Sequence, residues 1–288
     1  MEIESKLIKS LEMSGLKPQT IESHIIKIKV FLRNIEETNP NNITLDTILE
    51  FLRELKYEKK YAIGTVNSYR SSLKYLYEII LEKQWLDKKV PRLHGYKPLP
   101  FVLSQEDIIR FIQAVSNKMY QYVLYTMYSS GLRVGEVVAL KVKDIDSTRM
   151  LIYIAEGKNG SARNAILSKK NLKLLREYIL EWKRKYGYKF APEDYLFPSS
   201  YSKGDHISSK TIKNNIIKTA KRINFNKPIT SHVFRHSYAT HLYEAGVDIF
   251  AIKKLMGHKN IRTTSIYTQL ASLSNMGFSS PFDMEGDK

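Results

Sequence analysis

Arg133 stands at a spacing that could serve phosphate chemistry. It follows Gly131 in SSGLRVGE, so a helix that ends at the glycine would let this guanidinium stand near the start of the next helix. Backbone N–H groups and the helix dipole favour an anion at such a point. Glu136 lies one helical turn further on and could pair with Arg133. A lone arginine in such a turn is more often an ordinary surface residue. Further candidate residues elsewhere in the chain are therefore needed before this segment indicates a site.

A second candidate is Lys158, which lies in the expected turn of a β-hairpin over residues 155–167. An amine on a flexible stem can enter a DNA groove and deliver a proton to a leaving oxygen. Most turn lysines are only solvated, however, so this signal is weak when it stands alone.

His232 and Arg235 form a third candidate pair in TSHVFRHSYATHL. They are three residues apart and therefore share one face of a helix whose cap is Thr230 or Ser231. An imidazole beside a permanently charged guanidinium suits phosphate binding combined with proton transfer.

A zinc site is the rival interpretation of the same segment. His232 and His236 are four residues apart and could both bind the metal, but no glutamate follows the first histidine and no carboxylate-rich third ligand lies close by. His236 and His241 are more simply explained as inner-face histidines that hydrogen-bond to the backbone.

The fourth candidate segment is LMGHKNIRTTSIYTQL, residues 255–270. Gly257 and His258 would end one helix, and Tyr267 follows nine residues after His258 on a short helix. The chain has 19 tyrosines, most of which must pack rather than react. Only the neighbouring basic segments make Tyr267 a candidate nucleophile.

The elements that must position these residues fall into two groups. The first 90 residues carry four apolar stripes with helical spacing, over residues 3–11, 21–35, 48–55 and 66–80. Gly15 and Pro18 separate the first two stripes, and Pro40 precedes the third, with Thr44 or Asp46 as its cap. We expect a compact helical domain over residues 1–90.

Prolines and Gly95 then prevent a continuous helix, which predicts a linker over residues 91–101. Helical patterning resumes after a Ser104 cap and continues through about Tyr128. Three short strands are predicted over 142–145, 151–154 and 164–167, and helices over about 169–186, 208–222, 230–245, 248–256 and 260–268. The expected fold class is therefore mainly α with a small antiparallel β-sheet, and the second domain covers residues 102–288.

Composition limits the partners and the chemistry. The 288 residues carry a formal net charge of +17, with +3 on residues 1–92 and +14 on residues 93–288. This surplus indicates a nucleic-acid partner, although lysine enrichment in an AT-rich genome would explain the bulk charge equally well. The absence of cysteine excludes disulfides, thiolate metal sites and a cysteine nucleophile. No apolar run is long enough to span a membrane and no signal peptide is visible, so we expect a cytoplasmic protein.

The ordered set Arg133, Lys158, His232-x-x-Arg235, Gly257-His258 and Tyr267 resembles the tyrosine recombinase family, which includes phage integrases, Xer-type recombinases and Cre. The segments SGLRVGE, HVFRHSYATHLYEAGVD and LMGHKNIRTTSIYT are close to the family consensus, and the likeness covers essentially the whole chain. It implies a two-domain tyrosine recombinase architecture, with a helical core-binding (SAM-like) domain and a mixed α/β catalytic domain.

The resemblance implies that Tyr267 attacks the scissile phosphate, which gives a 3′-phosphotyrosyl link and a free 5′-hydroxyl. Arg133 and Arg235 would neutralise charge on the non-bridging oxygens. A phenol with a pKa near ~10 is a poor nucleophile at neutral pH, so its proton must leave as the new bond forms. Fixed cations around the phosphorus would supply the stabilising field.

The same resemblance implies that His232 is a proton acceptor and phosphate ligand, that His258 is a further phosphate ligand, and that Lys158 protonates the leaving 5′-oxygen. The hairpin departs from the usual GKGxKxR pattern, since it is GKNGSAR here and lacks the second lysine. Gln269 stands where the family often has histidine, at a position outside the catalytic set.

No cofactor or metal is expected. Fixed guanidiniums and imidazoles take the place of a metal ion, so we predict activity in EDTA. The phosphotyrosine stores the broken bond, so a partner's 5′-hydroxyl can reverse the attack without ATP, and no P-loop motif is present.

The resemblance implies duplex DNA with a specific recombination site as the partner. It also suggests a homotetramer on two DNA sites, alone or with a related second recombinase. The chain resembles the Xer-like or transposon-borne type more than the large phage integrases. Apolar residues beyond Tyr267 would dock into a neighbouring subunit: Leu270, Leu273, Met276, Phe278 and Phe282.

Two other classes remain open. A topoisomerase IB-like enzyme would nick and religate DNA with the same tyrosine and without pairing two sites. A non-catalytic DNA-binding protein is disfavoured, because all six reactive positions hold competent residues. Residues 1–90, which are large enough to clamp DNA from the opposite side, favour the recombinase.

Overall fold

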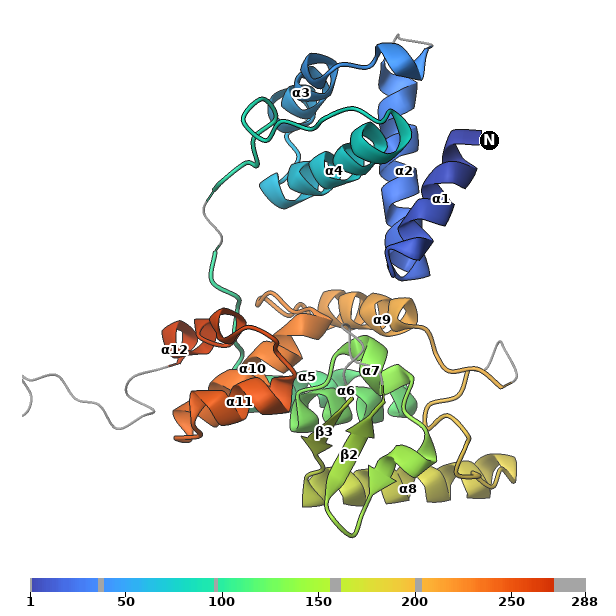
Figure 1. Ribbon diagram of the computed structural model, residues 1–288. Coiled ribbons are helices and arrows are strands. Elements are labelled where there is room, and N and C mark those ends of the chain that lie inside the picture. The colour runs from blue at the N-terminus through green and yellow to red at the C-terminus, as the bar shows by residue number, and fades with distance from the viewer. Residues whose placement is uncertain (1, 36–38, 96–97, 156–161, 200–203, 272–288) are drawn as a thin grey trace, which may run out of the picture. The chain divides into compact units, whose positions relative to one another are not determined.

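The computed structural model describes residues 2–35, 39–95, 98–155, 162–199 and 204–271. The chain divides into two compact units, Met1–Lys97 and Pro98–Lys288. Figure 1 shows both, and the division falls inside the segment 91–101 that the sequence suggests as a linker. No helix among the described residues is both long and apolar enough to cross a membrane.

The first unit is all-helical in its described part, as its apolar stripes predict. Its α-helices are α1 (Glu2–Met13), α2 (Pro18–Asn34), α3 (Leu45–Arg53) and α4 (Ile63–Tyr75). A 3₁₀ turn spans Pro40–Asn42, and π-helical turns over Glu54–Glu58 and Leu76–Ile80 extend α3 and α4.

Local side chains explain where these helices begin. Pro18 opens α2, where its missing N–H costs nothing. Thr44 caps α3 and accepts a hydrogen bond from the Thr47 amide, so Thr44 rather than Asp46 is the cap. The rings of Phe31 and Phe51 meet edge-on at 5.1 Å in the core of this unit.

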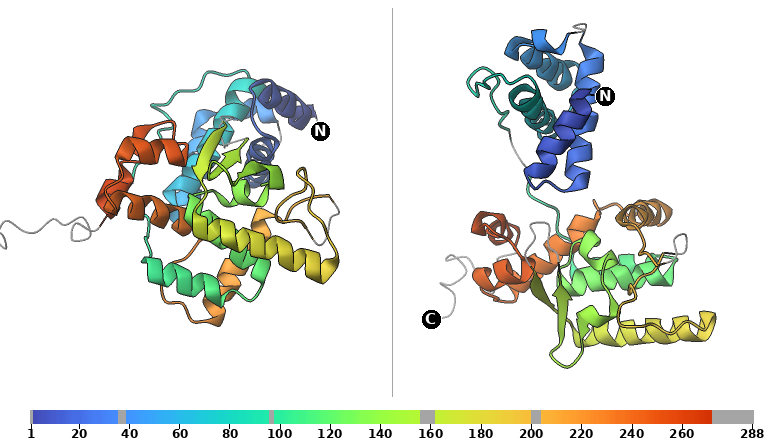
Figure 2. Two further views of the ribbon diagram at one scale, coloured as in Figure 1. Left: turned by 90° about the horizontal axis from the view of Figure 1, so that it is seen from below. Right: turned by 45° about the vertical axis from the view of Figure 1, so that its right-hand side comes forward.

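The second unit holds most of the predicted helices. They are α5 (Gln105–Ala114), α6 (Lys118–Ser130), α7 (Val134–Val138), α8 (Lys169–Tyr186), α9 (Ser209–Arg222), α10 (Ser231–Glu244), α11 (Ile249–Met256) and α12 (Ile266–Leu270). Ser104 caps α5 as predicted, by accepting from the Asp107 amide. Figure 2 shows α8 as a long helix, and it packs against α6.

Three antiparallel strands form the sheet, in the order β1 (Ile145–Asp146), β2 (Leu151–Ile154) and β3 (Arg163–Ile166). Leu151 pairs with Ile166, and Ile154 pairs with Arg163, so β2 and β3 are the two arms of the predicted hairpin. A small antiparallel sheet in a mainly helical chain is the fold class that the sequence predicts, and it is confirmed.

Three boundaries differ from the prediction. Val142–Asp144 is a 3₁₀ turn instead of a strand, because the Asp144 carboxylate accepts from the Lys141 amide at 2.8 Å and closes a turn. The helix expected up to Tyr128 is broken between α5 and α6, where Asn117 caps a new helix. Residues 260–268 hold a 3₁₀ turn, Ile261–Thr263, before the short α12.

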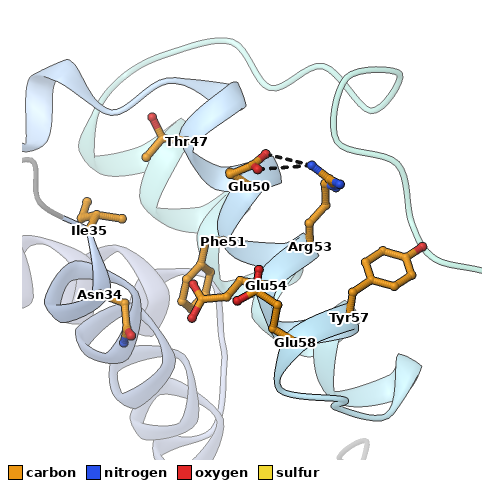
Figure 3. A pocket seen from close by; sticks show the side chains of 9 residues that line it. All are labelled: Asn34, Ile35, Thr47, Glu50, Phe51, Arg53, Glu54, Tyr57 and Glu58. Atoms are coloured by element: carbon orange, nitrogen blue, oxygen red, sulfur yellow. Dashed lines mark hydrogen bonds and ion pairs between the residues drawn. The ribbon is translucent and has the colours of Figure 1, made fainter.

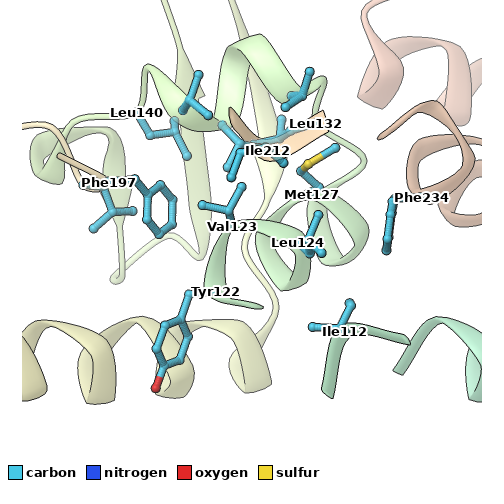
Figure 4. Packing of buried hydrophobic residues seen from close by; sticks show 14 of the residues in the cluster. Ile112, Tyr122, Val123, Leu124, Met127, Leu132, Leu140, Phe197, Ile212 and Phe234 are labelled. Atoms are coloured by element: carbon cyan, nitrogen blue, oxygen red, sulfur yellow. The ribbon is translucent and has the colours of Figure 1, made fainter. Parts of the chain in front are cut away.

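The core of the second unit surrounds α6 and fixes α7. Figure 4 shows its close packing, with Val123 and Met127 of α6 among Leu140, Phe197 and Phe234. The three valines of α7, residues 134, 137 and 138, are buried in this core. A smaller cluster joins α10, α11 and α12 through Tyr238, Ala239, Ile252, Met256 and Tyr267. These two clusters hold the candidate residues in place.

Candidate active site

Gly131 and Arg133 take the positions that the sequence predicts. Gly131 ends α6 in the left-handed conformation (φ 63°), and Arg133 is the N-cap of α7. A Cβ at Gly131 would come within 2.3 Å of the Tyr238 ring, so only glycine fits this turn. The tight turn delivers Arg133 to the surface between two clusters of the core.

Glu136 lies at the centre of three guanidiniums. Its Oε1 accepts from Arg133 Nη1 at 2.8 Å, and its two oxygens accept from Arg163 Nη1 and Nη2 at 2.9 and 2.8 Å. Arg235 Nη1 lies 3.8 Å from Glu136 Oε2. Burial alone would raise the pKa of Glu136, but the hydrogen bonds and charge of Arg163, together with Arg133, lower it to about 2. The carboxylate is therefore permanently charged at neutral pH.

The Arg133 backbone N–H is not available to an anion, although the start of a helix would suggest that it is. Its N–H donates to Glu136 Oε2 at 2.8 Å, so a protein carboxylate already uses this amide. A phosphate at Arg133 would therefore meet the guanidinium rather than the Arg133 amide.

Arg235 is buried beneath the site, with its side chain 4% exposed. Its Nη1 donates to the Gly131 carbonyl at 2.6 Å, its Nη2 donates to the Met256 carbonyl, and the same Nη2 lies 3.3 Å from His258 Nε2. Burial, and then the charge of Arg133, lower the pKa of Arg235 to about 10, which leaves it charged at neutral pH. Arg235 thus ties the turn before α7 to the turn after α11.

His258 follows Gly257, which ends α11 in the left-handed conformation. His258 Nδ1 lies 3.0 Å from the Thr264 hydroxyl, which fixes the ring orientation. Burial, and then the neighbouring arginines led by Arg235, lower the pKa of His258 to about 4. The imidazole is therefore neutral at pH 7 in the protein without DNA.

Tyr267 lies on α12 and is only 1% exposed. Its hydroxyl is 3.4 Å from His236 Nδ1, and its ring stacks on His258 with centroids 6.3 Å apart. Burial raises the pKa of Tyr267 despite the opposing charges of Arg235 and Arg133. The phenol is fully protonated at neutral pH, so reaction requires a proton acceptor.

His236 differs from its predicted role as a histidine bound to the backbone, because it contacts the Tyr267 hydroxyl. Burial, and then His232 and Arg235, lower its pKa to about 4, so it is neutral at pH 7. His232 is exposed on the same helix, with its ring 6.2 Å from that of His236. In the part of the chain that the structure describes, no three His, Cys, Asp or Glu residues form a metal-binding group.

His241 hydrogen-bonds to the backbone at Leu103, as predicted, and it also has a side-chain partner. Its Nδ1 lies 2.9 Å from the Tyr128 hydroxyl, and the two rings meet edge-on. Lys158 falls in residues 156–161 and the tail residues from 273 onward fall in 272–288, and both segments lie outside the described residues.

The structure thus brings Arg133, Arg235, His258 and Tyr267 into one connected group, with His232 on the same helix as Arg235. Sequence reasoning missed Arg163, which opens β3 and reaches Glu136. The one available signal was its place as the final arginine of GKNGSAR, the only basic position that this run shares with GKGxKxR after its first lysine. Nothing in the sequence showed that it would point inward.

The electrostatics of the described group favour an anion. Three guanidiniums surround one carboxylate, which leaves a surplus of positive charge that is partly screened from water by burial. Arg133, with its side chain 25% exposed, is open to a ligand from solvent. A phosphodiester at Arg133 would therefore meet a surplus of positive charge, whereas Tyr267 is buried beside it in the resting protein.

The first unit holds a pocket of about 540 Å³ whose lining is acidic, unlike that of the candidate site. Figure 3 shows its lining from α2, α3 and the π-helical turn after α3, with Glu50, Glu54 and Glu58 among the side chains. Three carboxylates would repel a phosphate backbone, so this pocket adds nothing to the candidate site.

Comparison with known proteins shows which family this chain belongs to. Residues 102–273 match the Phage integrase family, and residues 4–87 match the N-terminal SAM-like domain of phage integrases. The chain is 33% identical over 231 residues to the putative integrase/recombinase y4eF of Sinorhizobium fredii, which covers 80% of this chain and 88% of that protein. It is 29% identical over 265 residues to tyrosine recombinase XerA of Pyrococcus horikoshii, with 91% and 87% covered.

Among solved structures, the chain is similar to XerH site-specific recombinase bound to a palindromic difH substrate. The TM-score is 0.70 at 21% identity, over 97% of this chain and 85% of that one. This likeness shows a shared fold.

Proposed function

Because this chain belongs to the phage integrase family of DNA-cleaving and rejoining enzymes, we propose that it is a site-specific recombinase of duplex DNA with Tyr267 as its nucleophile. The observation that supports this assignment is the placement of a buried phenol against His236 and His258, beside the guanidiniums of Arg133 and Arg235. Tyr128 also hydrogen-bonds to an imidazole, that of His241, but burial alone shifts its pKa, whereas the charges of Arg235 and Arg133 act on the pKa of Tyr267.

The reaction transfers a DNA phosphoryl group from the 5′-oxygen to the tyrosine oxygen. The Tyr267 hydroxyl oxygen attacks the scissile phosphorus, the bond from phosphorus to the 5′-oxygen breaks, and a 3′-phosphotyrosyl link remains. The phenol proton passes to an imidazole, and the leaving 5′-oxygen receives a proton from Lys158. A 5′-hydroxyl from a second strand reverses these steps, so joining needs no nucleotide.

Arg133 and Arg235 stabilise the charge that develops on the non-bridging oxygens. Fixed donors of this kind are worth about 10²–10³ in rate each, by analogy with oxyanion holes. His258, held by Thr264, adds a further donor once it is protonated or in the right tautomer. Because protein cations supply this field, we expect cleavage to continue in EDTA.

Two imidazoles divide the proton chemistry. His236 Nδ1 lies 3.4 Å from the Tyr267 hydroxyl in the resting protein, and its lowered pKa keeps the imidazole neutral there, so that it accepts this hydrogen bond in the tautomer with its proton on Nε2. His232, exposed on the same helix, is the phosphate ligand and proton acceptor when DNA is bound. The hydroxyl must move from one partner to the other as the phosphate enters.

We further propose two structural domains with separate duties, residues 1–90 as the core-binding domain and 102–288 as the catalytic domain joined by 91–101. The active assembly is a tetramer on two DNA sites, alone or with a related second recombinase, and it works in the cytoplasm. We assign it to the Xer-like or mobile-element type, and its 29% identity to XerA over 91% of the chain supports this assignment.

A nicked suicide substrate tests the proposal against its nearest alternative. The nick lets the short 5′-hydroxyl fragment diffuse away, so a covalent protein–DNA adduct accumulates. A second, paired site in the same reaction reports recombinant product. We expect both adduct and recombinants. An adduct without recombinants supports a topoisomerase IB-like enzyme. The absence of both products would contradict catalysis altogether.

A further inference from the structure

Arg163 makes contacts that no catalytic role assigned so far explains. It opens β3, and its side chain is only 9% exposed. Its Nη1 and Nη2 donate to both oxygens of Glu136, and its Nε donates to the Leu255 carbonyl at 3.2 Å. A guanidinium with this fork geometry is held to the protein on all three of its nitrogens.

We propose that Arg163 is a positioning residue for DNA cleavage. It offsets the negative charge of Glu136, so that the charges of Arg133 and Arg235 stay available for the scissile phosphate. It also holds the turn that carries His258. This inference rests on the proposed function, since it names a further residue of the same site.

Charge balance gives the first reason. The cluster holds three guanidiniums and one carboxylate, a surplus of two positive charges. A phosphodiester brings one negative charge, and attack by a phenol that has lost its proton gives a pentavalent species with two. Without Arg163 the surplus falls to one, and the buried Glu136 would draw Arg133 and Arg235 towards itself.

The turn after α11 gives the second reason. Gly257 is in the left-handed conformation, and a Cβ there would come within 2.7 Å of Arg163 Cδ. The Arg163 stem thus occupies the space that a side chain at position 257 would fill. Because His258 follows directly, the contact of Arg163 with the Leu255 carbonyl fixes the backbone that aims this imidazole.

Position along the chain gives the third reason. Arg163 follows residues 156–161, which contain Lys158, with only Ala162 between. Because Arg163 opens β3, it ties this end of the strand to the arginine cluster.

The test compares Arg163→Gln and Arg163→Lys with the wild type on a nicked substrate at saturating protein. Arg176→Gln is the matched control, because it removes the same charge from an exposed position on α8. Each protein is also given the same substrate with a neutral methylphosphonate at the scissile position. DNA affinity and circular dichroism are measured in parallel.

We expect Arg163→Gln to slow adduct formation on the phosphodiester by about 10²-fold, the loss typical of one oriented donor. On the methylphosphonate the deficit should shrink to about tenfold or less, because a neutral centre needs less positive charge. Arg163→Lys keeps the charge but cannot fork across Glu136, so it should show a loss of about tenfold that is similar on both substrates. Arg176→Gln should cleave as the wild type does.

Three results would overturn the inference. They are wild-type cleavage by Arg163→Gln, an equal loss on both substrates in that variant, and a loss in Arg163→Lys as large as that in Arg163→Gln. If Arg163→Gln does not fold, a folded Arg163→Lys with wild-type cleavage also overturns it. If the wild type forms no adduct, the proposed function fails instead, which keeps the two failures distinct.

Discussion

Glu136 and the two imidazoles beside Tyr267 set the protonation states of the resting site. Glu136 keeps its charge because Arg163 and Arg133 outweigh its burial, whereas nothing compensates His236 and His258, which stay neutral. Among the described residues that contact Glu136, the positive charge therefore lies on Arg133, Arg163 and Arg235. An anion next to His258 would then favour its protonated form.

A substitution at His236 should separate it from an ordinary packing histidine. We expect His236→Ala to slow adduct formation by about tenfold or more, because the Tyr267 hydroxyl loses the imidazole 3.4 Å away that positions it before His232 takes its proton. His241→Ala is the matched control on the same helix, because its partner is Tyr128, and it should leave the rate per folded protein within about twofold. Equal rate losses in the two variants, measured on the nicked substrate, would contradict a role for His236.

Acid should destabilise this protein in a defined window. His236 and His258 have folded pKa values of about 4 against an ordinary 6.5, so below pH 6.5 the unfolded chain binds protons that the folded protein does not. The free energy of unfolding should therefore fall as the pH drops from about 6.5 to 4. Glu136 adds a later loss between about pH 4.5 and 2, because its folded pKa is about 2.

Urea unfolding at pH 7, 5.5 and 4.5 measures this dependence. His258→Gln removes one of the two imidazoles and should lose less stability than the wild type between pH 7 and 4.5. An identical pH dependence in the two proteins would show that His258 titrates normally in the folded state.

The sequence predicted the residues of the site better than their partners. Arg235 became a candidate through its spacing to His232, and Tyr267 through its neighbouring basic segments and the resemblance to the tyrosine recombinase family. Arg163 was missed because its contacts, to Glu136 and to Leu255, link residues 27 and 92 positions apart. Local spacing carries no information about such long-range pairs.

At the scale of elements, helix ends decide where the site residues point. Gly131, Gly187 and Gly257 each end a helix in the left-handed conformation, yet their surroundings differ. A Cβ added at Gly187 would meet no described atom within 4 Å, whereas one at Gly131 would meet the Tyr238 ring. The turn at Gly131 therefore combines a backbone requirement with a packing requirement.

Replacing these glycines by alanine should show the difference. Gly187→Ala should cost about 1 kcal/mol, the strain of a left-handed alanine. Gly131→Ala should cost about 3 kcal/mol or more, because its Cβ would also meet the Tyr238 ring at 2.3 Å. Urea unfolding measures both, and equal costs would mean that Tyr238 moves aside freely.

The same scale shows which elements can be predicted. α8 lies over residues 169–186 as predicted, because its long amphipathic stripe and its Ser168 cap agree. The predicted strand at 142–145 was wrong in its first three residues. The Asp144 carboxylate accepts a hydrogen bond from the Lys141 amide there and closes a turn. Short elements depend on such single contacts, which hydrophobic periodicity does not detect.

At the scale of the whole molecule, the distribution of charge bears on how DNA is bound. The second unit, residues 98–288, carries +13 of the net charge of +17. Most counterion release on binding should therefore come from this unit. The domain that holds Tyr267 is thus also the one expected to carry most of the phosphate contacts.

Removing the residues after Leu270 tests the proposed assembly. We expect this truncation to preserve DNA binding and to impair strand exchange, because the apolar residues of the tail would dock in a neighbouring subunit. Gel shift and recombination assays on paired sites measure the two properties separately. Full-rate exchange by the truncated protein would rule out the docking.

The chemical identity of the DNA attachment tests the role of Tyr267 most directly. Trypsin cleaves after Arg262, and the peptide 263–288 that follows contains Tyr267 as its single tyrosine. After reaction with a nicked substrate and nuclease digestion, mass spectrometry of the wild type should find the nucleotide remnant on Tyr267. Tyr267→Phe should bind DNA and yield no adduct. A covalent adduct in Tyr267→Phe, or a remnant on another residue of the wild type, would contradict the claim.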